Sequence, residues 1–279
     1  MNTNNTPDAA KPRQIERVRH TLKMRLLTVL RTEHLTPHML RITLSGDDLD
    51  GFVSAAHDDH VKLFFPAPGS DQPTLPTLGQ QGVVADENMQ KPIARNYTPR
   101  RYDAVRKELD IDFMLHGDGP ASLWAARAKP GMTLGVGGPR GSMVVPNDFD
   151  WYLLIGDQTA LPAIARRLEE LPAHAQVIAV IAVADAGEKI ALSSDAQTRL
   201  IWLDQSTSSA DTSDLFVSAL KDLELPAGDG YAWVAAELNS AQTVRKYLLQ
   251  ERGLDKHQVH AASYWRNGAS EHHQTHDDE

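Results

Sequence analysis

The chain has 279 residues, of which 41% are hydrophobic and 23% charged, and its formal net charge is −9. At that length we expect roughly two globular domains of about 100–150 residues each. The acidic balance argues against general nucleic-acid binding, and the absence of cysteine excludes disulfides, iron–sulfur clusters and thiolate zinc sites. Redox chemistry would therefore need a bound organic cofactor.

Residues 1–19 are mostly polar and lack the hydrophobic core of a secretory signal. No apolar run in the chain approaches the ~18–20 residues that a bilayer span requires. We therefore expect a cytoplasmic protein without membrane insertion, disordered over residues 1–19, and we take a monomer as the default state.

Residues 20–147 form the first predicted domain. From Lys23 to about Pro146 apolar residues mostly alternate with polar ones, and turn formers separate the runs. That pattern is typical of the strands of a small antiparallel β-barrel. A stretch rich in Pro, Gly and Gln at residues 67–91 interrupts the alternation and predicts a surface loop.

Residues 148–268 form the second predicted domain. Short, fully apolar runs such as WYLLIG and AQVIAVIAV now alternate with helical segments. Buried strands alternating with helices predict an α/β domain with a parallel sheet. Residues 269–279 are polar and predict a disordered tail; we interpret its three histidines as solvated, and we expect no metal site.

The stretch RNYTPRR is the first that points to chemistry. Arg95 and Tyr97 are two apart on a predicted strand, so their side chains leave the same face, and Pro99 keeps Thr98 extended. A guanidinium, an aromatic ring and a hydroxyl presented together suit a planar ring system with a phosphate tail, such as a flavin. An ordinary solvated charge run is the alternative interpretation.

The stretch HGDGPASLWAA follows the next predicted strand. Gly117, Gly119 and Pro120 predict a tight loop, after which Ala121 and Ser122 open a short helix with free backbone N–H groups. By itself this pattern indicates only a capped helix. Next to RNYT, it would bind the pyrophosphate of a flavin nucleotide.

The stretch LLIGDQTALPAI opens the second domain. It runs from an apolar strand through Gly156 into a helix with Thr159 as the expected N-cap and Pro162 in the first turn. Its glycines do not follow the G-x-G-x-x-G fingerprint, so the pattern is weak evidence for dinucleotide binding. The first strand-to-helix turn of a parallel sheet is nevertheless where a nucleotide would bind.

Taken together, these stretches resemble the siderophore-interacting proteins, which are cytoplasmic flavin-dependent ferric-siderophore reductases of the ferredoxin-reductase-like superfamily. The resemblance extends over residues 20–270 and rests on RNYTPRRYD, HGDGPASLWA, GGPRGS, GDQTALPAI, WVAAE and SYWRNG, in that order. RNYT alone would indicate only the superfamily, whereas GDQTALPAI with a terminal YWR is more specific. The resemblance implies an FAD-binding barrel followed by an α/β domain that binds NAD(P)H.

By this resemblance, residues of the first domain would hold FAD. Arg95 would meet the pyrophosphate, Tyr97 the isoalloxazine ring and Thr98 the N5 edge of that ring. The other residues implied for the FAD site are His116, Gly119, Ala121 and Ser122.

The resemblance also implies a nicotinamide side in the second domain. The residues implied to line it are Gly156, Asp157, Thr159 and Ala160. Glu237 would lie near the nicotinamide or the flavin. The family usually has glycine before that glutamate, whereas this chain has Ala236, whose methyl group could crowd the nicotinamide.

The choice between NADPH and NADH depends on other residues. Arg166, Arg167 and Lys189 are candidates for contact with the 2′-phosphate of NADPH. Asp185, near the end of the second parallel strand, could instead bind a ribose hydroxyl of NADH. We favour NADPH.

Three separated cations match positions at which the family receives an anionic ferric siderophore: Lys62, Arg140 and Arg266. A low-dielectric cleft focuses an attractive field for an anion even in an acidic protein, although each residue could be an ordinary surface cation. Arg100 and Arg101 could serve the adenine end of FAD or the siderophore. Catecholate, hydroxamate and citrate-type siderophores would all be attracted to the same charges.

The implied function is ferric-siderophore reduction, in which electrons pass from NAD(P)H through FAD to iron and ferrous iron is released for assimilation. Flavin suits this role because it converts a two-electron donor into single-electron steps, and no protein side chain needs to act as acid, base or metal ligand. One alternative is a stand-alone flavin reductase or the reductase component of an oxygenase. Another is a non-catalytic carrier of ferric siderophore.

Overall fold

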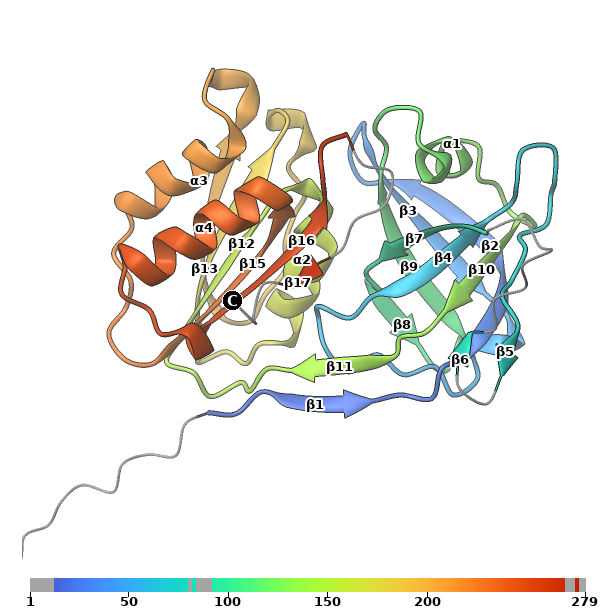
Figure 1. Ribbon diagram of the computed structural model, residues 1–279, viewed down its shortest axis with the longest axis horizontal. Helices are drawn as coiled ribbons and strands as arrows, with labels where there is room; N and C mark the ends of the chain where they lie inside the picture. Colours follow the sequence, from blue (N-terminus) through green and yellow to red (C-terminus); the bar gives the residue numbers. More distant parts are fainter. Residues whose placement is uncertain (1–12, 80–81, 84–91, 269–273, 276–279) are drawn as a thin grey trace, which may run out of the picture.

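The computed structural model describes residues 13–79, 82–83, 92–268 and 274–275. Two domains lie side by side: a curled antiparallel sheet and a parallel sheet with helices on both faces (Figure 1). The predicted architecture, a barrel followed by an α/β domain, is confirmed. No helix within the described ranges is long and apolar enough to cross a membrane.

The antiparallel sheet has the strand order β7-β4-β10-β2-β3-β9-β8. Its strands are β2 (Met24–His34), β3 (Met39–Ser45), β4 (Val61–Phe65), β7 (Ile93–Tyr97), β8 (Arg101–Asp103), β9 (Glu108–Met114) and β10 (Thr133–Gly137). Alternate side chains such as Leu27 and Ile111 fill its core and are fully buried. Helix α1 (Pro120–Ala126) closes one end by packing Trp124 against Phe113.

The stretch predicted as a surface loop, residues 67–91, contains a small hairpin of β5 (Leu78–Gly79) and β6 (Gly82–Val83). Residues 80–81 and 84–91 lie outside the described ranges. Leu75 packs on β10, where a Cβ at Gly135 would come within 2.2 Å of the leucine Cδ2. Part of the stretch is therefore packed on the barrel.

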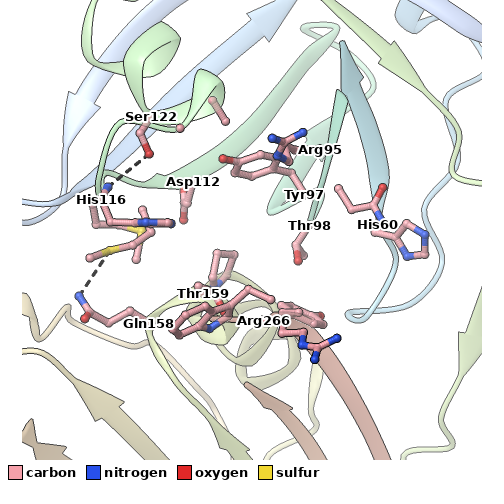
Figure 2. Close-up of a pocket in the computed structure, with 18 of the residues that line it drawn as sticks. His60, Arg95, Tyr97, Thr98, Asp112, His116, Ser122, Gln158, Thr159 and Arg266 are labelled. Atoms are coloured by element: carbon pink, nitrogen blue, oxygen red, sulfur yellow. Dashed lines mark hydrogen bonds between the residues drawn. The ribbon is translucent and has the colours of Figure 1, made fainter. Parts of the chain in front are cut away.

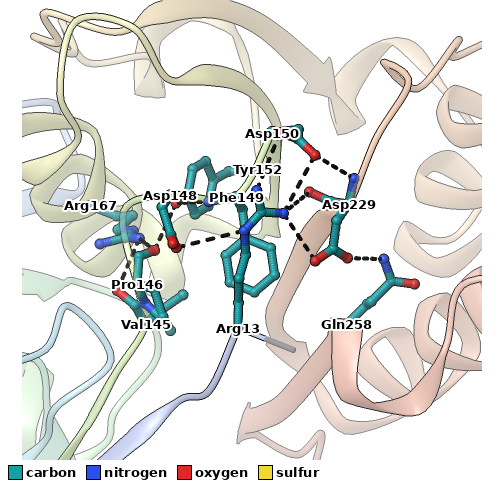
Figure 3. A network of polar contacts seen from close by, with 10 residues as sticks. All are labelled: Arg13, Val145, Pro146, Asp148, Phe149, Asp150, Tyr152, Arg167, Asp229 and Gln258. Atoms are coloured by element: carbon teal, nitrogen blue, oxygen red, sulfur yellow. Dashed lines mark hydrogen bonds and ion pairs between the residues drawn. The ribbon is translucent and has the colours of Figure 1, made fainter. Parts of the chain in front are cut away.

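The N-terminal segment is structured from residue 13 onward, so the prediction of disorder is wrong for residues 13–19. Strand β1 (Glu16–Arg19) pairs antiparallel with β11 (Gly141–Val144). The Arg13 guanidinium lies over the ring of Phe149, 5.3 Å from its centroid (Figure 3). It also contacts the carboxylates of Asp148, Asp150 and Asp229. These partners are distant in sequence, which is why composition alone misjudged the segment.

The second sheet has the strand order β14-β13-β12-β15-β16-β17, with only the last pair antiparallel. Its strands are β12 (Trp151–Gly156), β13 (Gln176–Val183), β14 (Gln197–Asp204), β15 (Gly230–Glu237), β16 (Val259–Trp265) and β17 (Gln274–Thr275). Strand β12 is buried along its whole length, as its apolar sequence predicts. Strand β17 falls in the tail predicted as disordered, whereas the tail histidines lie outside the described residues.

Helices cover both faces of this sheet (Figure 1). They are α2 (Leu161–Glu170) on one face and α3 (Thr212–Lys221) with α4 (Leu238–Gln250) on the other. Alternation along β12 separates the two cores: Leu154 packs on the α2 side and Leu153 on the other. Short 3-10 helices lie at η1 (Asp47–Leu49), η2 (Gln158–Ala160), η3 (Ala186–Glu188), η4 (Gln205–Thr207) and η5 (Lys256–Gln258).

Polar contacts hold the two domains against each other. From the barrel, the Thr36 hydroxyl and the His38 ring contact the buried carboxylate of Glu188 at 2.5 and 2.6 Å. From α2, Arg166 donates to the carbonyl oxygens of Ser54 and Pro99 at 3.0 and 3.1 Å. These contacts set the spacing between the domains, and the candidate site lies in that space.

Candidate active site

A cavity of about 450 Å³ lies between the two domains. The barrel contributes β7 and the start of α1, and the α/β domain contributes η2, the start of α2, the end of β16 and the residues after it. Figure 2 shows Arg95, Tyr97 and Thr98 on one side and Thr159 and Arg266 on the other. Every residue predicted for FAD lines this cavity: Arg95, Tyr97, Thr98, His116, Gly119, Ala121 and Ser122.

Strand β7 presents its predicted residues as the spacing requires. Tyr97 packs against Phe113, with ring centroids 4.5 Å apart, and burial raises the pKa of its hydroxyl. The Arg95 guanidinium donates to the carbonyl of Ala94 at 2.6 Å and has no ion pair among the described residues. Its remaining N–H groups therefore give this wall hydrogen-bonding capacity that no described residue uses.

The loop before α1 brings backbone N–H groups to the cavity. Gly117 has φ 56°, a conformation that favours glycine. Gly119 is the N-cap without a side-chain hydrogen bond to the helix, and nothing lies within 4 Å of the position of a Cβ there. The Ser122 hydroxyl accepts from the backbone N–H of His116 at 3.3 Å. The loop thus leaves room beside the N–H groups that open α1.

These donors fit a flavin nucleotide. A guanidinium without a carboxylate partner, uncapped N–H groups and an open glycine loop suit a pyrophosphate, and the neighbouring tyrosine supplies an aromatic surface for a ring. Within the described ranges, no group of three or more His, Asp or Glu side chains is arranged to hold a metal ion.

The turn after β12 plays a different part from the one predicted. Of Gly156, Asp157, Thr159 and Ala160, only Thr159 lines the cavity. A Cβ at Gly156 would lie 2.5 Å from the Cβ of Ala160, which is itself fully buried. Ala160 therefore presents no side chain to a ligand, and the pair instead allows η2 to pack closely on the sheet.

Asp157, and not Thr159 as predicted, caps this turn. One of its oxygens accepts from the backbone N–H of Thr159 at 2.9 Å, and the other accepts from Trp265 Nε1 at 2.8 Å and Glu237 N–H at 3.0 Å. Burial raises the pKa of Asp157, and these hydrogen bonds oppose the rise. The carboxylate therefore joins the ends of β12, β15 and β16 beneath the cavity.

Glu237 is the N-cap of α4. One carboxylate oxygen accepts from Asn239 N–H at 2.6 Å, and the other accepts from Asn267 N–H at 3.3 Å. Glu237 is not among the residues that line the cavity. The preceding Ala236 is fully buried in the core beneath α3 and α4, so its methyl group does not project toward the cavity as predicted.

Of the three predicted cations, Arg266 lines the cavity, together with His60, which sequence reasoning missed (Figure 2). Burial lowers the pKa of His60, and the positive charges of Lys62 and Arg140 lower it further. The negative charges of Asp58 and Asp59 partly oppose this shift. Lys62 pairs with Asn96 across β4 and β7, so it leaves the opposite face from Arg95. Neither Lys62 nor Arg140 is among the cavity residues.

Two further arginines have carboxylate partners within the structure. Arg100, one of the pair considered for the adenine or the siderophore, is buried in a bidentate pair with Glu169 of α2, at 2.8 and 2.5 Å. Its neighbour Arg101 pairs with Asp110 at 2.9 Å. Both side chains are engaged in structural ion pairs.

The arginines proposed for a 2′-phosphate are also engaged elsewhere. Arg166 bonds to the barrel, and the buried Arg167 donates to Asn147 and to carbonyl oxygens at the domain junction. Lys189 remains exposed after η3. Asp185 caps η3 by accepting from Gly187 N–H at 2.7 Å.

The structure also brings Tyr264 and Trp265 into the cavity. Ser263 pairs with Ala236 and Trp265 with Glu237, so Tyr264 is an extra residue at a bulge in β16. Bulges redirect side chains and occur beside active sites. The motif SYWRNG contains both aromatic residues, but its sequence does not reveal the bulge.

Two family models together match most of the chain: "Siderophore-interacting FAD-binding domain" over residues 28–143 and "Siderophore-interacting protein" over residues 149–268. The NADPH-dependent ferric-chelate reductase of Escherichia coli K12 is 39% identical over 257 residues, covering 91% of this chain and 97% of that protein. The chain belongs to the siderophore-interacting protein family.

Other comparisons agree with this membership. The ferric vibriobactin reductase ViuB of Vibrio cholerae is 35% identical, with 88% of this siderophore-interacting protein and 91% of ViuB covered. A siderophore utilization protein from T. fusca has 40% identity and a TM-score of 0.84, covering 92% of this chain and 97% of that one. A flavohemoglobin from Malassezia yamatoensis shares the fold, with 12% identity and a TM-score of 0.61. The match covers 90% of this chain and 61% of the flavohemoglobin chain.

Proposed function

We propose that this siderophore-interacting protein is a ferric-siderophore reductase, which passes electrons from NADPH through FAD to siderophore-bound Fe(III) and releases Fe(II). The observation that carries the proposal is the interdomain cavity, in which every residue expected for FAD meets a turn of the α/β domain and the cation Arg266. Relatives named as ferric-chelate and ferric vibriobactin reductases support the same activity.

In the proposed complex, Arg95 pairs with the pyrophosphate together with the N–H groups of Ala121 and Ser122. Tyr97 would pack against the isoalloxazine ring, and Thr98 would contact its N5 edge. Bound FAD supplies the conversion of a two-electron donor into single-electron transfers. The side chains hold and orient the ring, and they exclude water from the face that packs on the barrel.

The proposed donor is NADPH, approaching from the α/β side past Thr159. With Arg166 and Arg167 bonded elsewhere, Lys189 is the remaining candidate for the 2′-phosphate. The exposed carboxylate of Asp185 accepts one hydrogen bond from Gly187 N–H and keeps its second oxygen, so it stays the alternative contact for a ribose hydroxyl of NADH. The name of the Escherichia coli relative favours NADPH as well.

The proposed acceptor site is the cationic rim formed by Lys62, Arg140 and Arg266, beside His60, whose lowered pKa keeps it neutral. An anionic ferric siderophore would be drawn to it, since clustered charges at a cleft raise the local concentration of the opposite charge. Ferrous iron would then leave because hard oxygen ligands hold it less strongly than ferric iron. We further propose that the protein acts in the cytoplasm as a monomer.

A visible spectrum under nitrogen tests the proposal. FAD-loaded protein should bleach with NADPH, and its flavin bands should return after addition of a ferric siderophore while a ferrous-iron trap develops colour. Reoxidation by free flavin but not by ferric siderophore would indicate a flavin reductase instead. Siderophore binding without NADPH oxidation would indicate a carrier, and failure to bind FAD at all would refute the reductase.

A further inference from the structure

A hydrogen-bond chain leads from the cavity to the domain boundary. The Tyr264 hydroxyl donates to Asp58 Oδ1 at 2.6 Å, and Asp58 Oδ2 lies 3.1 Å from Nε2 of His260. The side chain of Thr98 acts on the same hydroxyl and lowers its pKa. Thr98 and Tyr264 both line the cavity, whereas Asp58 comes from the segment before β4. The Tyr264–Asp58 hydrogen bond therefore connects the cavity, which Thr98 also lines, with a carboxylate outside it.

This chain has a fixed direction. A carboxylate only accepts hydrogen bonds, so Tyr264 uses its single proton on Asp58, and toward Thr98 its oxygen can act only as an acceptor. A Thr98 hydroxyl that donates to Tyr264 would present its own lone pairs to the cavity. Hydrogen bonds from His260 and Tyr264 hold the pKa of Asp58 low against burial, while burial and Asp58 keep the pKa of Tyr264 well above its usual value. The tyrosine is thus neutral and the aspartate charged at neutral pH.

Burial makes this route selective. Thr98 is 7% exposed, and a flavin in the cavity would cover it further. The side chain of Asp58 is 15% exposed and that of His260 is 5% exposed, so of these two Asp58 is the one that reaches solvent. Tyr264 is also partly exposed, and it lines the cavity. His57, which precedes Asp58 in the chain, is fully buried and packs edge-on against Trp233. Burial lowers the pKa of His57 to about 3. It stays neutral and does not compete as a proton acceptor.

The proposed reaction leaves one proton to remove. A hydride from NADPH carries two electrons and one proton to the flavin. Two ferric ions accept the electrons one at a time and take no proton, so the sum is NADPH + 2 Fe(III) → NADP⁺ + 2 Fe(II) + H⁺. The proton must therefore leave the flavin in every turnover.

We propose that Thr98, Tyr264 and Asp58 form the relay that carries this proton from the flavin to solvent. Thr98 accepts the proton and passes its own to Tyr264, Tyr264 passes its own to Asp58, and Asp58 releases it to water. The bulge in β16 is what places the Tyr264 hydroxyl between the other two groups. This inference rests on the proposed flavin chemistry, but it does not depend on the siderophore as acceptor.

The test uses FAD-loaded protein and the one-electron acceptor ferricyanide, which needs no siderophore site. Protein reduced with one equivalent of NADPH is mixed rapidly with ferricyanide in weakly buffered solution containing a pH indicator. Wild-type protein should release one proton per NADPH as the flavin reoxidises. Tyr264→Phe keeps the ring but breaks the relay, so proton release should slow at least ~10-fold. Added imidazole should restore the rate in proportion to its concentration.

Controls separate a relay from a structural role. Tyr102→Phe loses a hydrogen bond to a backbone carbonyl inside the barrel and should behave as wild type. FAD affinity, measured by fluorescence, should change less than ~2-fold in Tyr264→Phe; if that variant fails to bind FAD, Asp58→Asn provides the same test. Wild-type proton release, or a slow rate that does not respond to imidazole, would overturn the relay. A wild-type protein that releases protons with ferricyanide but reduces no ferric siderophore would refute only the proposed function.

Discussion

Replacing Arg95 with alanine should weaken FAD binding without unfolding the barrel. The guanidinium lies in the cavity wall, with one N–H on the Ala94 carbonyl and no ion pair among the described residues. Its remaining donors are available for a pyrophosphate. Arg95→Ala therefore removes ligand contacts and leaves no buried carboxylate without a partner.

The size of the effect follows from the bonds that are lost. A hydrogen bond to a charged group contributes about 1.5–3 kcal/mol, so the dissociation constant of FAD should rise roughly 10- to 150-fold. Arg95→Lys keeps the charge but loses the forked geometry, and it should fall between wild type and alanine.

Quenching of FAD fluorescence by apoprotein, titrated at low salt, would measure the affinity. Arg31→Ala is the matched control, because it removes an exposed arginine of the same barrel that pairs with Glu108. Its FAD affinity should equal that of wild type. If Arg95→Ala bound FAD within ~2-fold of wild type and melted at the same temperature, the assignment of Arg95 to the pyrophosphate would be refuted.

Three further outcomes are expected. Lys62→Ala and Arg266→Ala should each raise the KM for an anionic ferric siderophore at low salt with FAD still bound; wild-type kinetics in both would contradict the cationic rim. Gly156→Ala should destabilise the protein by about 1–3 kcal/mol in urea unfolding, because its Cβ would lie 2.5 Å from that of Ala160; an unchanged midpoint would show that the turn relaxes. His57 is neutral in the fold with a pKa near 3, whereas the unfolded chain binds its proton below pH ~6.5, so stability should fall on acidification by up to ~1.4 kcal/mol per pH unit. His57→Asn should reduce the pH dependence of the free energy of unfolding between pH 6.5 and 5. An equal dependence in both proteins would show that His57 is not its source.

The two domain types and the core of the flavin site could be predicted from the sequence, because both depend on short-range order. The period-two pattern of the barrel strands indicates burial on one face of the sheet. The continuous apolar runs of β12 and β13 indicate burial on both faces. Arg95 and Tyr97 share a face because they are two apart on one strand. Such relations hold wherever the strand is placed.

Only the tertiary structure decided which polar residues remain available for a ligand. Arg100 and Arg166 sit in sequence motifs that suggested nucleotide or siderophore contacts, yet each bonds across the domain boundary. The same long-range pairing orders Arg13, and a bulge of one residue in β16 turns Tyr264 toward Asp58. Local spacing determines which face a side chain leaves, whereas its partner depends on residues that the fold brings from far along the chain.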